Sequence, residues 1–157
     1  MHKEVPGLLC LGLATANEPL AQASYPEPVK EWDNDWTVLT MAPDGSWGVA
    51  SHDWVIEALS RAIGNCRKMS RHEIGCGAIF TTIRAGWSLG YRCGDKNIVM
   101  AEARLEDAEV RADWREYELR QLYDPDMPPC VRIVTVDPHG RVVPPDLWYS
   151  DRIFSSP

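Results

Sequence analysis

The stretch CGAIFTTIRAGWSLGYRC, residues 76–93, lies in the middle of the chain, and the predicted fold is organised around it. It contains two runs rich in β-branched and aromatic residues, 78–83 and 87–93, separated by the short segment 84–86. Two such runs joined by a few residues that include glycine are typical of a β-hairpin. A cysteine stands at each end, and a segment with helical periodicity lies on either side. We therefore expect a hairpin at the centre of the fold.

The rest of the chain predicts one order of elements twice. The first unit has strands at 37–42 and 47–51, a helix from about 53 to 69 with Asp53 as its N-cap, and a strand at 78–83. The second has strands at 87–93 and 98–101, a helix from about 104 to 123 and a strand at 131–136, with a short strand at 141–143 after it. The units align without a gap when Trp36 is matched to Trp87, an offset of 51 residues. Either an old duplication or a chance recurrence of the order explains this match.

Each predicted helix has one apolar face. These faces consist of Val55, Leu59, Ala62, Ile63 and Cys66 in the first helix, and of Leu105, Ala108, Ala112, Leu119 and Leu122 in the second. On the outside of the second helix, Asp107 with Arg111 and Glu116 with Arg120 are spaced as i,i+4 ion pairs. The pattern predicts a two-layer α+β domain: a mostly antiparallel sheet of about six or seven strands with two helices on one face.

The N-terminal residues have the features of an export signal. An apolar run at 7–16 is followed by Ala21 and Ala23, the small-x-small pattern that precedes cleavage, so we interpret 1–23 as a signal peptide. The alternative is a buried N-terminal segment of a cytosolic protein. The remaining chain is divided into an extended leader (24–35), a single α+β domain (36–143) and a C-terminal tail (144–157), which either docks through Leu147, Trp148 and Phe154 or stays mobile. We expect a periplasmic or secreted protein with no membrane span in the mature chain.

Four cysteines remain once residues 1–23 are removed. An even number of cysteines in an oxidising compartment predicts two disulfides, for which four residues allow three pairings. Cys66 and Cys76 are close in sequence, so we expect them to pair and Cys93 to pair with Cys130. The alternative is a zinc site with four thiolate ligands. No two of these cysteines have the C-x₂₋₄-C spacing of such sites, so we expect no metal.

Four stretches resemble a group of small exported bacterial proteins of unknown function: TVLTMAPDGSWGVAS, EALSRAIGNC, GWSLGYRCGD and LYDPDMPPCVRIVTVDPHG. In that group a W-G-x-A motif precedes a helix that ends near a cysteine, and a second cysteine follows. Residues 47–50 and 62–66 carry this pattern here. The resemblance implies export and a similar fold but no established activity. Some members are labelled adenylate cyclases, yet neither of the phosphate-binding patterns G-x-G-x-x-G and G-x-x-x-x-G-K occurs in this chain.

Composition and motifs limit the classes of function. The net charge of −7 and the pI near 5.0 argue against a nucleic-acid partner, which requires a basic face. The segment Ser51-His52-Asp53 contains the residue types of a catalytic triad, but consecutive residues cannot adopt triad geometry. His72 and His139 lie in predicted loops far apart in the sequence. We therefore assign no catalytic residue and no cofactor.

The leading hypothesis is a small disulfide-stabilised binding or interaction protein whose partner is a protein or another envelope component. The alternatives are a hydrolase-type enzyme with a site assembled from loops, and a domain that serves only as structure. The candidate contacts with a ligand or partner are Arg84, Trp87, Arg92, His139 and Trp148. Four arginines lie on or beside predicted strands: Arg84, Arg92, Arg104 and Arg132. They form a pocket for an anion or an acidic partner if several of them share one sheet face, and are otherwise separate surface charges.

Overall fold

The computed structural model describes residues 35–70 and 74–148. The elements are β1 (Trp36–Met41), β2 (Trp47–His52), α1 (Val55–Met69), β3 (Ile79–Arg84), β4 (Trp87–Cys93), β5 (Lys96–Glu102), α2 (Leu105–Leu122), β6 (Val131–Val136) and the short 3₁₀ helix η2 (Pro145–Leu147). The predicted signal peptide and almost all of the predicted leader lie outside the described residues, as does His72. The predicted strand at 141–143 is reduced to one bridge, between Val136 and Val142.

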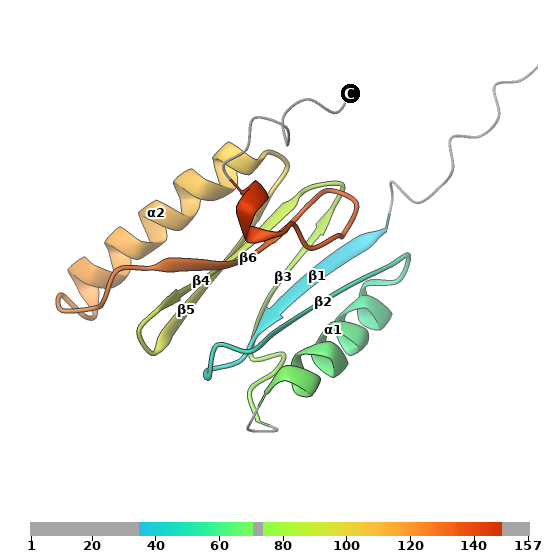
Figure 1. The fold of residues 1–157 in the computed structure, drawn as a ribbon, viewed down its shortest axis with the longest axis horizontal. Coiled ribbons are helices and arrows are strands. Elements are labelled where there is room, and N and C mark those ends of the chain that lie inside the picture. Colours follow the sequence, from blue (N-terminus) through green and yellow to red (C-terminus); the bar gives the residue numbers. More distant parts are fainter. Residues whose placement is uncertain (1–34, 71–73, 149–157) are drawn as a thin grey trace, which may run out of the picture.

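The strands form two antiparallel sheets, with the orders β2-β1-β3 and β5-β4-β6. The α+β class, the antiparallel pairing and the approximate strand number are therefore confirmed. The arrangement differs from the predicted single sheet, because the two sheets stack face to face and each carries one helix on its outer face (Figure 1). Val38 of β1 packs against Ala58 and Ala62 of α1, whereas its neighbour Leu39 packs against Val134 of the other sheet. A strand that is apolar on both faces has to be covered on both.

The predicted central hairpin is wrong. β3 pairs with β1, and β4 lies between β5 and β6, so the two strands of the stretch 76–93 belong to different sheets. The turn between them carries the chain across, with Ala85 at a φ of 48°. It is tightly packed: a Cβ on Gly86 would lie 2.3 Å from Cδ1 of Ile83 and 2.7 Å from the carbonyl oxygen of Glu102. Both edges of β4 are already paired, which leaves none for β3.

The predicted repetition of element order is confirmed, and it extends to the strand order within each sheet. In each unit the first strand is central, and the second and third strands flank it. The helix of each unit packs on the first two strands of its own unit, α1 on β1 and β2 and α2 on β4 and β5. The molecule is thus two similar β-β-α-β units that pack sheet against sheet.

Both predicted disulfide pairs are present in the structure, and they occupy different places in the two units. Cys66–Cys76 joins the last turns of α1 to the segment before β3. Cys93–Cys130 joins the end of β4 to the residue before β6. Cys66 and Cys93 have no exposed surface. Cys93–Cys130 thus joins the ends of two strands that already pair, whereas Cys66–Cys76 fixes the approach to β3 against α1.

The start of α1 differs from the prediction that Asp53 is its N-cap. The N-cap residue is Trp54, and no side chain makes a capping hydrogen bond. The Asp53 carboxylate instead lies 2.6 Å from Nδ1 of His52, and that nitrogen accepts a hydrogen bond of 3.1 Å from the Trp54 backbone N–H. His52 and Asp53 thus contact each other at the entrance to the helix, without reaching its first turn.

The faces of α2 also differ in part from the prediction. Leu105, Ala108 and Ala112 are buried as expected, but Leu122, the last residue of the helix, is 70% exposed. Arg120 pairs with Glu116 at 2.8 Å, as predicted. The predicted Asp107–Arg111 pair is wrong. Arg111 pairs instead with Glu102 at 2.8 Å, since the end of β5 lies beneath the helix.

Candidate ligand-binding pocket

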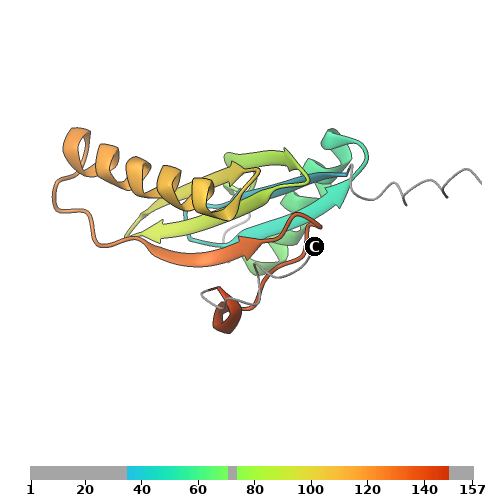
Figure 2. The same ribbon diagram turned by 90° about the horizontal axis from the view of Figure 1, so that it is seen from above.

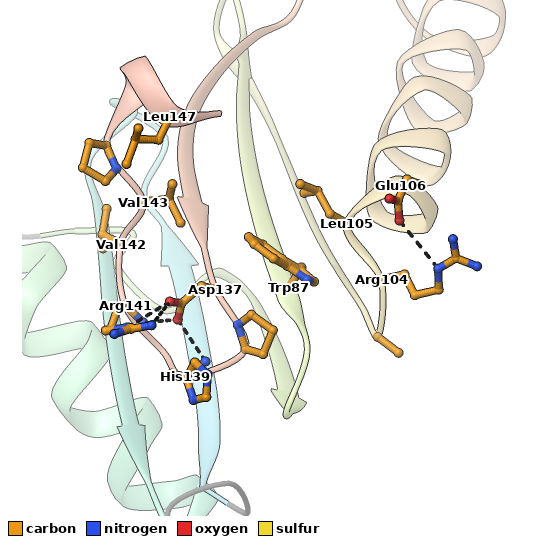
Figure 3. Close-up of a pocket in the computed structure, with 13 residues that line it drawn as sticks. Trp87, Arg104, Leu105, Glu106, Asp137, His139, Arg141, Val142, Val143 and Leu147 are labelled. Carbon is orange, nitrogen blue, oxygen red and sulfur yellow. Dashed lines mark hydrogen bonds and ion pairs between the residues drawn. The ribbon is translucent and has the colours of Figure 1, made fainter. Parts of the chain in front are cut away.

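Two of the candidate contact residues, Trp87 and His139, line one pocket (Figure 3). The pocket has a volume of about 570 Å³, which is within the range of small-molecule sites. It lies between the N-terminal end of α2 and the segment 137–147. Its walls consist of Trp87, Ala103, Arg104, Leu105, Glu106, Asp137, Pro138, His139, Arg141, Val142, Val143, Pro144 and Leu147. Most of these side chains are apolar, and the charged ones come from two separate segments.

The pocket exists because α2 does not cover all of its sheet. The helix packs on β5 and β4, while β6 runs between α2 on one side and η2 on the other (Figure 2). After β6 the chain turns back, and Val142 bridges Val136 while the Val143 N–H donates to the carbonyl oxygen of Thr135 at 2.9 Å. This return segment forms one wall, and Leu105 at the start of α2 forms the opposite one.

The turn at the mouth of the pocket is shaped by Asp137. One carboxylate oxygen, Oδ1, accepts hydrogen bonds of 2.9 Å from the backbone N–H groups of His139 and Arg141. The other, Oδ2, accepts from Nε of Arg141 at 2.9 Å. Because both oxygens are engaged, this carboxylate is poorly suited to act as a general base. Among the described residues that line the pocket, none has a hydroxyl or thiol side chain to serve as a nucleophile.

Two arginines project from the rim. The Arg104 side chain is 71% exposed, and its Nε lies 3.6 Å from the carboxylate of Glu106. The Arg141 side chain is 74% exposed and pairs with Asp137 at 2.9 Å. A guanidinium has five N–H donors, so both arginines keep donors that face solvent. The mouth of an apolar pocket is therefore flanked by groups that can bind an anion.

A buried polar cluster lies elsewhere on the same face of the sheet. Arg132 of β6, 9% exposed, donates to the hydroxyl of Tyr91 at 2.8 Å and to the carboxylate of Glu109 on α2. The Trp148 ring lies 5.9 Å from the Arg132 guanidinium, and its Nε1–H donates to the carbonyl oxygen of Val143 at 2.8 Å. Trp148, a candidate contact residue, thus anchors the first residues of the predicted tail against β6.

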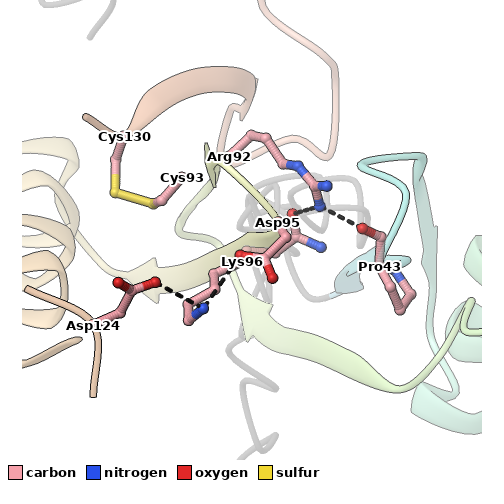
Figure 4. Close-up of polar contacts among 8 residues, drawn as sticks. Pro43, Arg92, Cys93, Asp95, Lys96, Asp124 and Cys130 are labelled. Carbon is pink, nitrogen blue, oxygen red and sulfur yellow. Dashed lines mark hydrogen bonds and ion pairs between the residues drawn. A yellow bond between two sulfur atoms is a disulfide. The ribbon is translucent and has the colours of Figure 1, made fainter. Parts of the chain in front are cut away.

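The other two candidate contacts lie apart from the pocket. The Arg84 guanidinium is stacked 4.5 Å from the Trp36 ring, in the other sheet. Arg92 donates to the carbonyl oxygen of Pro43 and to Oδ1 of Asn97 (Figure 4). Asn97 in turn donates to the carbonyl oxygen of Ala42 at 2.7 Å. Arg92 and Asn97 therefore tie one sheet to the β1–β2 turn of the other, and the two arginines share no anion pocket.

Two groups near α2 bind their protons more tightly in the folded protein. Burial raises the pKa of Tyr91 above 10.0, although the charge of Arg132 opposes the shift. Hydrogen bonds from Lys96 to Asp124 and then to Asp95, each 3.2 Å, raise the pKa of that lysine above 10.5 (Figure 4). Both shifts are upward from the values in an unfolded chain.

We expect the free energy of unfolding to fall as the pH is raised above about 10, the ordinary pKa of tyrosine. The stabilisation from Tyr91 and Lys96 is complete below their unfolded pKa values and is lost as the pH rises through the folded ones. Urea denaturation at a series of pH values measures this. In the Tyr91→Phe/Lys96→Met variant the dependence on pH above 10 should become shallower. An equally steep dependence in that variant would assign the effect to other groups.

Comparisons with protein-family models, curated proteins and solved structures found no match to this chain. Within the part of the chain that the structure describes, no three His, Cys, Asp or Glu side chains are grouped to hold a metal ion. In the same residues, no helix has the length and apolar character needed to cross a bilayer.

Sequence reasoning found Trp87 and His139 but missed most of the pocket. Arg104 is one of the arginines for which the sequence allows an anion pocket, but Leu105 is predicted only as part of the inner face of a helix and Val142 only as part of a short strand. A signal was present, since an apolar return segment after Asp137-Pro138-His139-Gly140 predicts that residues 141–144 pack against β6. What the sequence did not contain was the position of α2 relative to that segment.

Proposed function

We propose that this protein is an exported binding protein, stabilised by two disulfides, that binds an apolar ligand with an anionic group. The observation that carries the proposal is the pocket: an apolar chamber of about 570 Å³ with two exposed guanidinium groups at its rim. Val142 and Leu147 in its wall are 45% and 38% exposed, so apolar surface is available to a ligand. Burying that surface is favourable, at roughly 25 cal/mol per Å².

Binding is favoured over hydrolysis by the chemistry of the lining. An acyl or glycosyl transfer needs a nucleophile or a base positioned to activate water. The carboxylate of Asp137 is committed to the turn, and the other carboxylate in the wall, Glu106, faces Arg104 at the exposed rim. His139 also lines the pocket, but no hydroxyl or thiol among the described lining residues stands beside its imidazole to be activated. The arginines suit recognition of a carboxylate, sulfonate or phosphate, which a guanidinium contacts through two parallel hydrogen bonds.

Export is supported by the disulfides, which persist in oxidising compartments and are rare in the cytosol of most organisms. The pattern of residues 1–23 supports the same location. Cell fractionation followed by alkylation of any reduced thiols tests this. Recovery of the protein from the cytoplasm with four reactive thiols in the 66–130 region would contradict export.

The pocket is tested with anilinonaphthalene sulfonate, an apolar anion whose fluorescence rises in apolar surroundings. We expect saturable binding by the wild type. We expect about tenfold weaker binding by Leu147→Asp, because a carboxylate in the wall repels the sulfonate, and tenfold corresponds to about 1.4 kcal/mol. Phenylnaphthylamine, which lacks the sulfonate, should bind more weakly than the anion. The Arg104→Gln/Arg141→Gln variant should remove that preference.

Ile56→Asp is the matched control, since it makes the same kind of change at a side chain that is 74% exposed on α1 and lines neither the pocket nor the surface hollow around Trp114 on α2. It should bind the probe as the wild type does. If Leu147→Asp also binds as tightly as the wild type while both variants retain native circular dichroism, the probe does not enter the pocket and the proposal fails.

A further inference from the structure

Helix α2 carries apolar side chains on two opposite faces. Leu105, Ala108 and Ala112 pack against the sheet. On the far side, Val110, Trp114 and Tyr117 are 55%, 63% and 54% exposed. Their spacing of four and then three residues aligns them in one stripe along the helix. A helix on the surface of a domain normally presents charged and polar residues there, so this stripe marks an interaction surface.

The stripe forms a hollow with a defined shape. The Trp114 and Tyr117 rings have centroids 5.8 Å apart and are almost perpendicular, at 88°. Together with Val110 and Asp113 they line a hollow of about 400 Å³. The hollow is separate from the ligand pocket, with which it shares no lining residue. Two aromatic walls and one carboxylate thus surround a single space.

Within the residues that the structure describes, the one carboxylate of this hollow has no basic side chain paired with it. The ion pairs of the described part of α2 join Arg104 to Glu106, Arg111 to Glu102, Arg115 to Glu118, Arg120 to Glu116 and Arg132 to Glu109, and none includes Asp113. The Asp113 carboxylate lies near Tyr91, whose pKa is raised by burial and, to a smaller extent, by the charge of Asp113. The nearby arginines are already engaged: Arg111 pairs with Glu102 at 2.8 Å, and Arg115 pairs with Glu118 at 2.9 Å. The chain as a whole has a formal charge of −7. The hollow is therefore suited to receive a cation.

We propose that the Val110–Asp113–Trp114–Tyr117 hollow receives an arginine or lysine side chain presented by a basic segment of a partner protein. The faces of aromatic rings attract cations, and Trp and Tyr do so well. The alkyl stem of the basic residue packs on Val110 and the rings while its charged head meets Asp113. A second copy of α2 fits poorly, because two copies paired across this face bring two Asp113 carboxylates together.

The probe is the blocked pentapeptide Ala-Arg-Leu-Arg-Ala, with counterparts in which both arginines are replaced by glutamine or by glutamate. Binding is followed through the indole N–H resonance of Trp114 and the backbone amide resonances of α2 in NMR spectra of the full chain, and in Trp114→Ala through the amide resonances alone. We expect the arginine peptide to shift that resonance and to bind at least about tenfold more tightly than the glutamine peptide. The glutamate peptide should not bind. Higher salt should weaken the arginine complex.

Variants separate the groups in the hollow. Trp114→Ala should abolish binding of the arginine peptide, and Asp113→Asn should weaken it about fivefold by removing the ion pair. Trp54→Ala is the control, since Trp54 is 70% exposed at the start of the other helix. It should leave binding unchanged. Leu147→Asp, which alters the ligand pocket, should also bind the peptide normally.

Three results would overturn the proposal. The first is equal binding of the arginine and glutamine peptides, which would make the hollow a purely apolar surface. The second is binding that survives Trp114→Ala in a protein with native circular dichroism. The third is a concentration-dependent dimer in sedimentation that Trp114→Ala abolishes and the peptide does not displace, which would assign the stripe to a second copy of the chain.

Discussion

The Cys93→Ala/Cys130→Ala double variant should lose about 4 kcal/mol of unfolding free energy relative to the wild type. The disulfide links residues 37 apart in sequence, and the loop that it closes contains all of β5 and α2. In the chain-entropy account, removing such a link allows the unfolded chain many more conformations. The bond also lies within a core cluster in which Cys93 contacts Ile98, Ala112 and Met127. Guanidinium denaturation without reductant measures the loss.

The second disulfide provides the comparison. Cys66→Ala/Cys76→Ala opens a loop between residues only 10 apart, so we expect a smaller loss of about 3 kcal/mol. Replacing both members of each pair avoids leaving a lone thiol that exchanges with the remaining disulfide. If the order of the two variants is reversed, loop closure is not the main contribution of these disulfides. If neither variant is destabilised, the disulfides do not stabilise the fold.

Gly48→Ala should destabilise the protein by about 3 kcal/mol, the upper part of the usual range for overpacking. A Cβ at this position in β2 would lie 2.1 Å from the carbonyl oxygen of Ala62 and 2.4 Å from the backbone nitrogen of Cys66. Both atoms belong to the backbone of α1, so no side-chain rotation relieves the overlap. The helix would have to move away from the strand, with loss of its contacts to Val38.

Gly64→Ala is the matched control for this prediction. Gly64 lies in α1 itself, and a Cβ there would meet nothing within 4 Å. The same chemical change should therefore stabilise the protein by about 1 kcal/mol, since alanine is the better helix former. Thermal and urea denaturation of both variants measure the two opposite effects. Equal stabilities for the two variants would contradict the close approach of α1 to β2.

The Gly48 contact gives a physical reason for the pattern Trp47-Gly48-Val49-Ala50 noticed in the sequence. In β2, Gly48 and Ala50 face α1, whereas Trp47 and Val49 face the other sheet. Small residues on one side admit the helix, and large ones on the other fill the space between the sheets. The alternation was visible in the sequence. The sequence did not show which element covers each side of the strand.

Local patterns predicted the elements well and their partners less well. Both helices, the strand order along the chain and the repeat at an offset of 51 residues follow from periodicity and turn residues. The error at 76–93 arose because β-favouring residues on both sides of a glycine predict two strands without specifying that they pair. In the structure β4 has no edge available to β3. Pairing depends on which edges remain open, and that is a property of the whole sheet.

The two candidate surfaces illustrate the same difference. Trp87 and His139 are 52 positions apart, and the pocket that they share appears only when α2 leaves one side of β6 uncovered. Val110, Trp114 and Tyr117 have helical spacing in the sequence, but their spacing does not show whether this second apolar face is buried or exposed. The three side chains are exposed because α2 lies on the outside of the two packed sheets.

The sequence by itself determined the antiparallel α+β class, the two similar β-β-α-β units and the pairing of the four cysteines in the 66–130 region. These depend on periodicity, turn residues and cysteine spacing, which act over short stretches of chain. The tertiary structure alone decided that the strands form two sheets, that each helix covers a separate outer face, and that a pocket opens beside β6. Each unit by itself leaves one apolar face of its sheet exposed. The two units cover these faces only by packing on each other, and that packing decides the arrangement of sheets, helices and pocket.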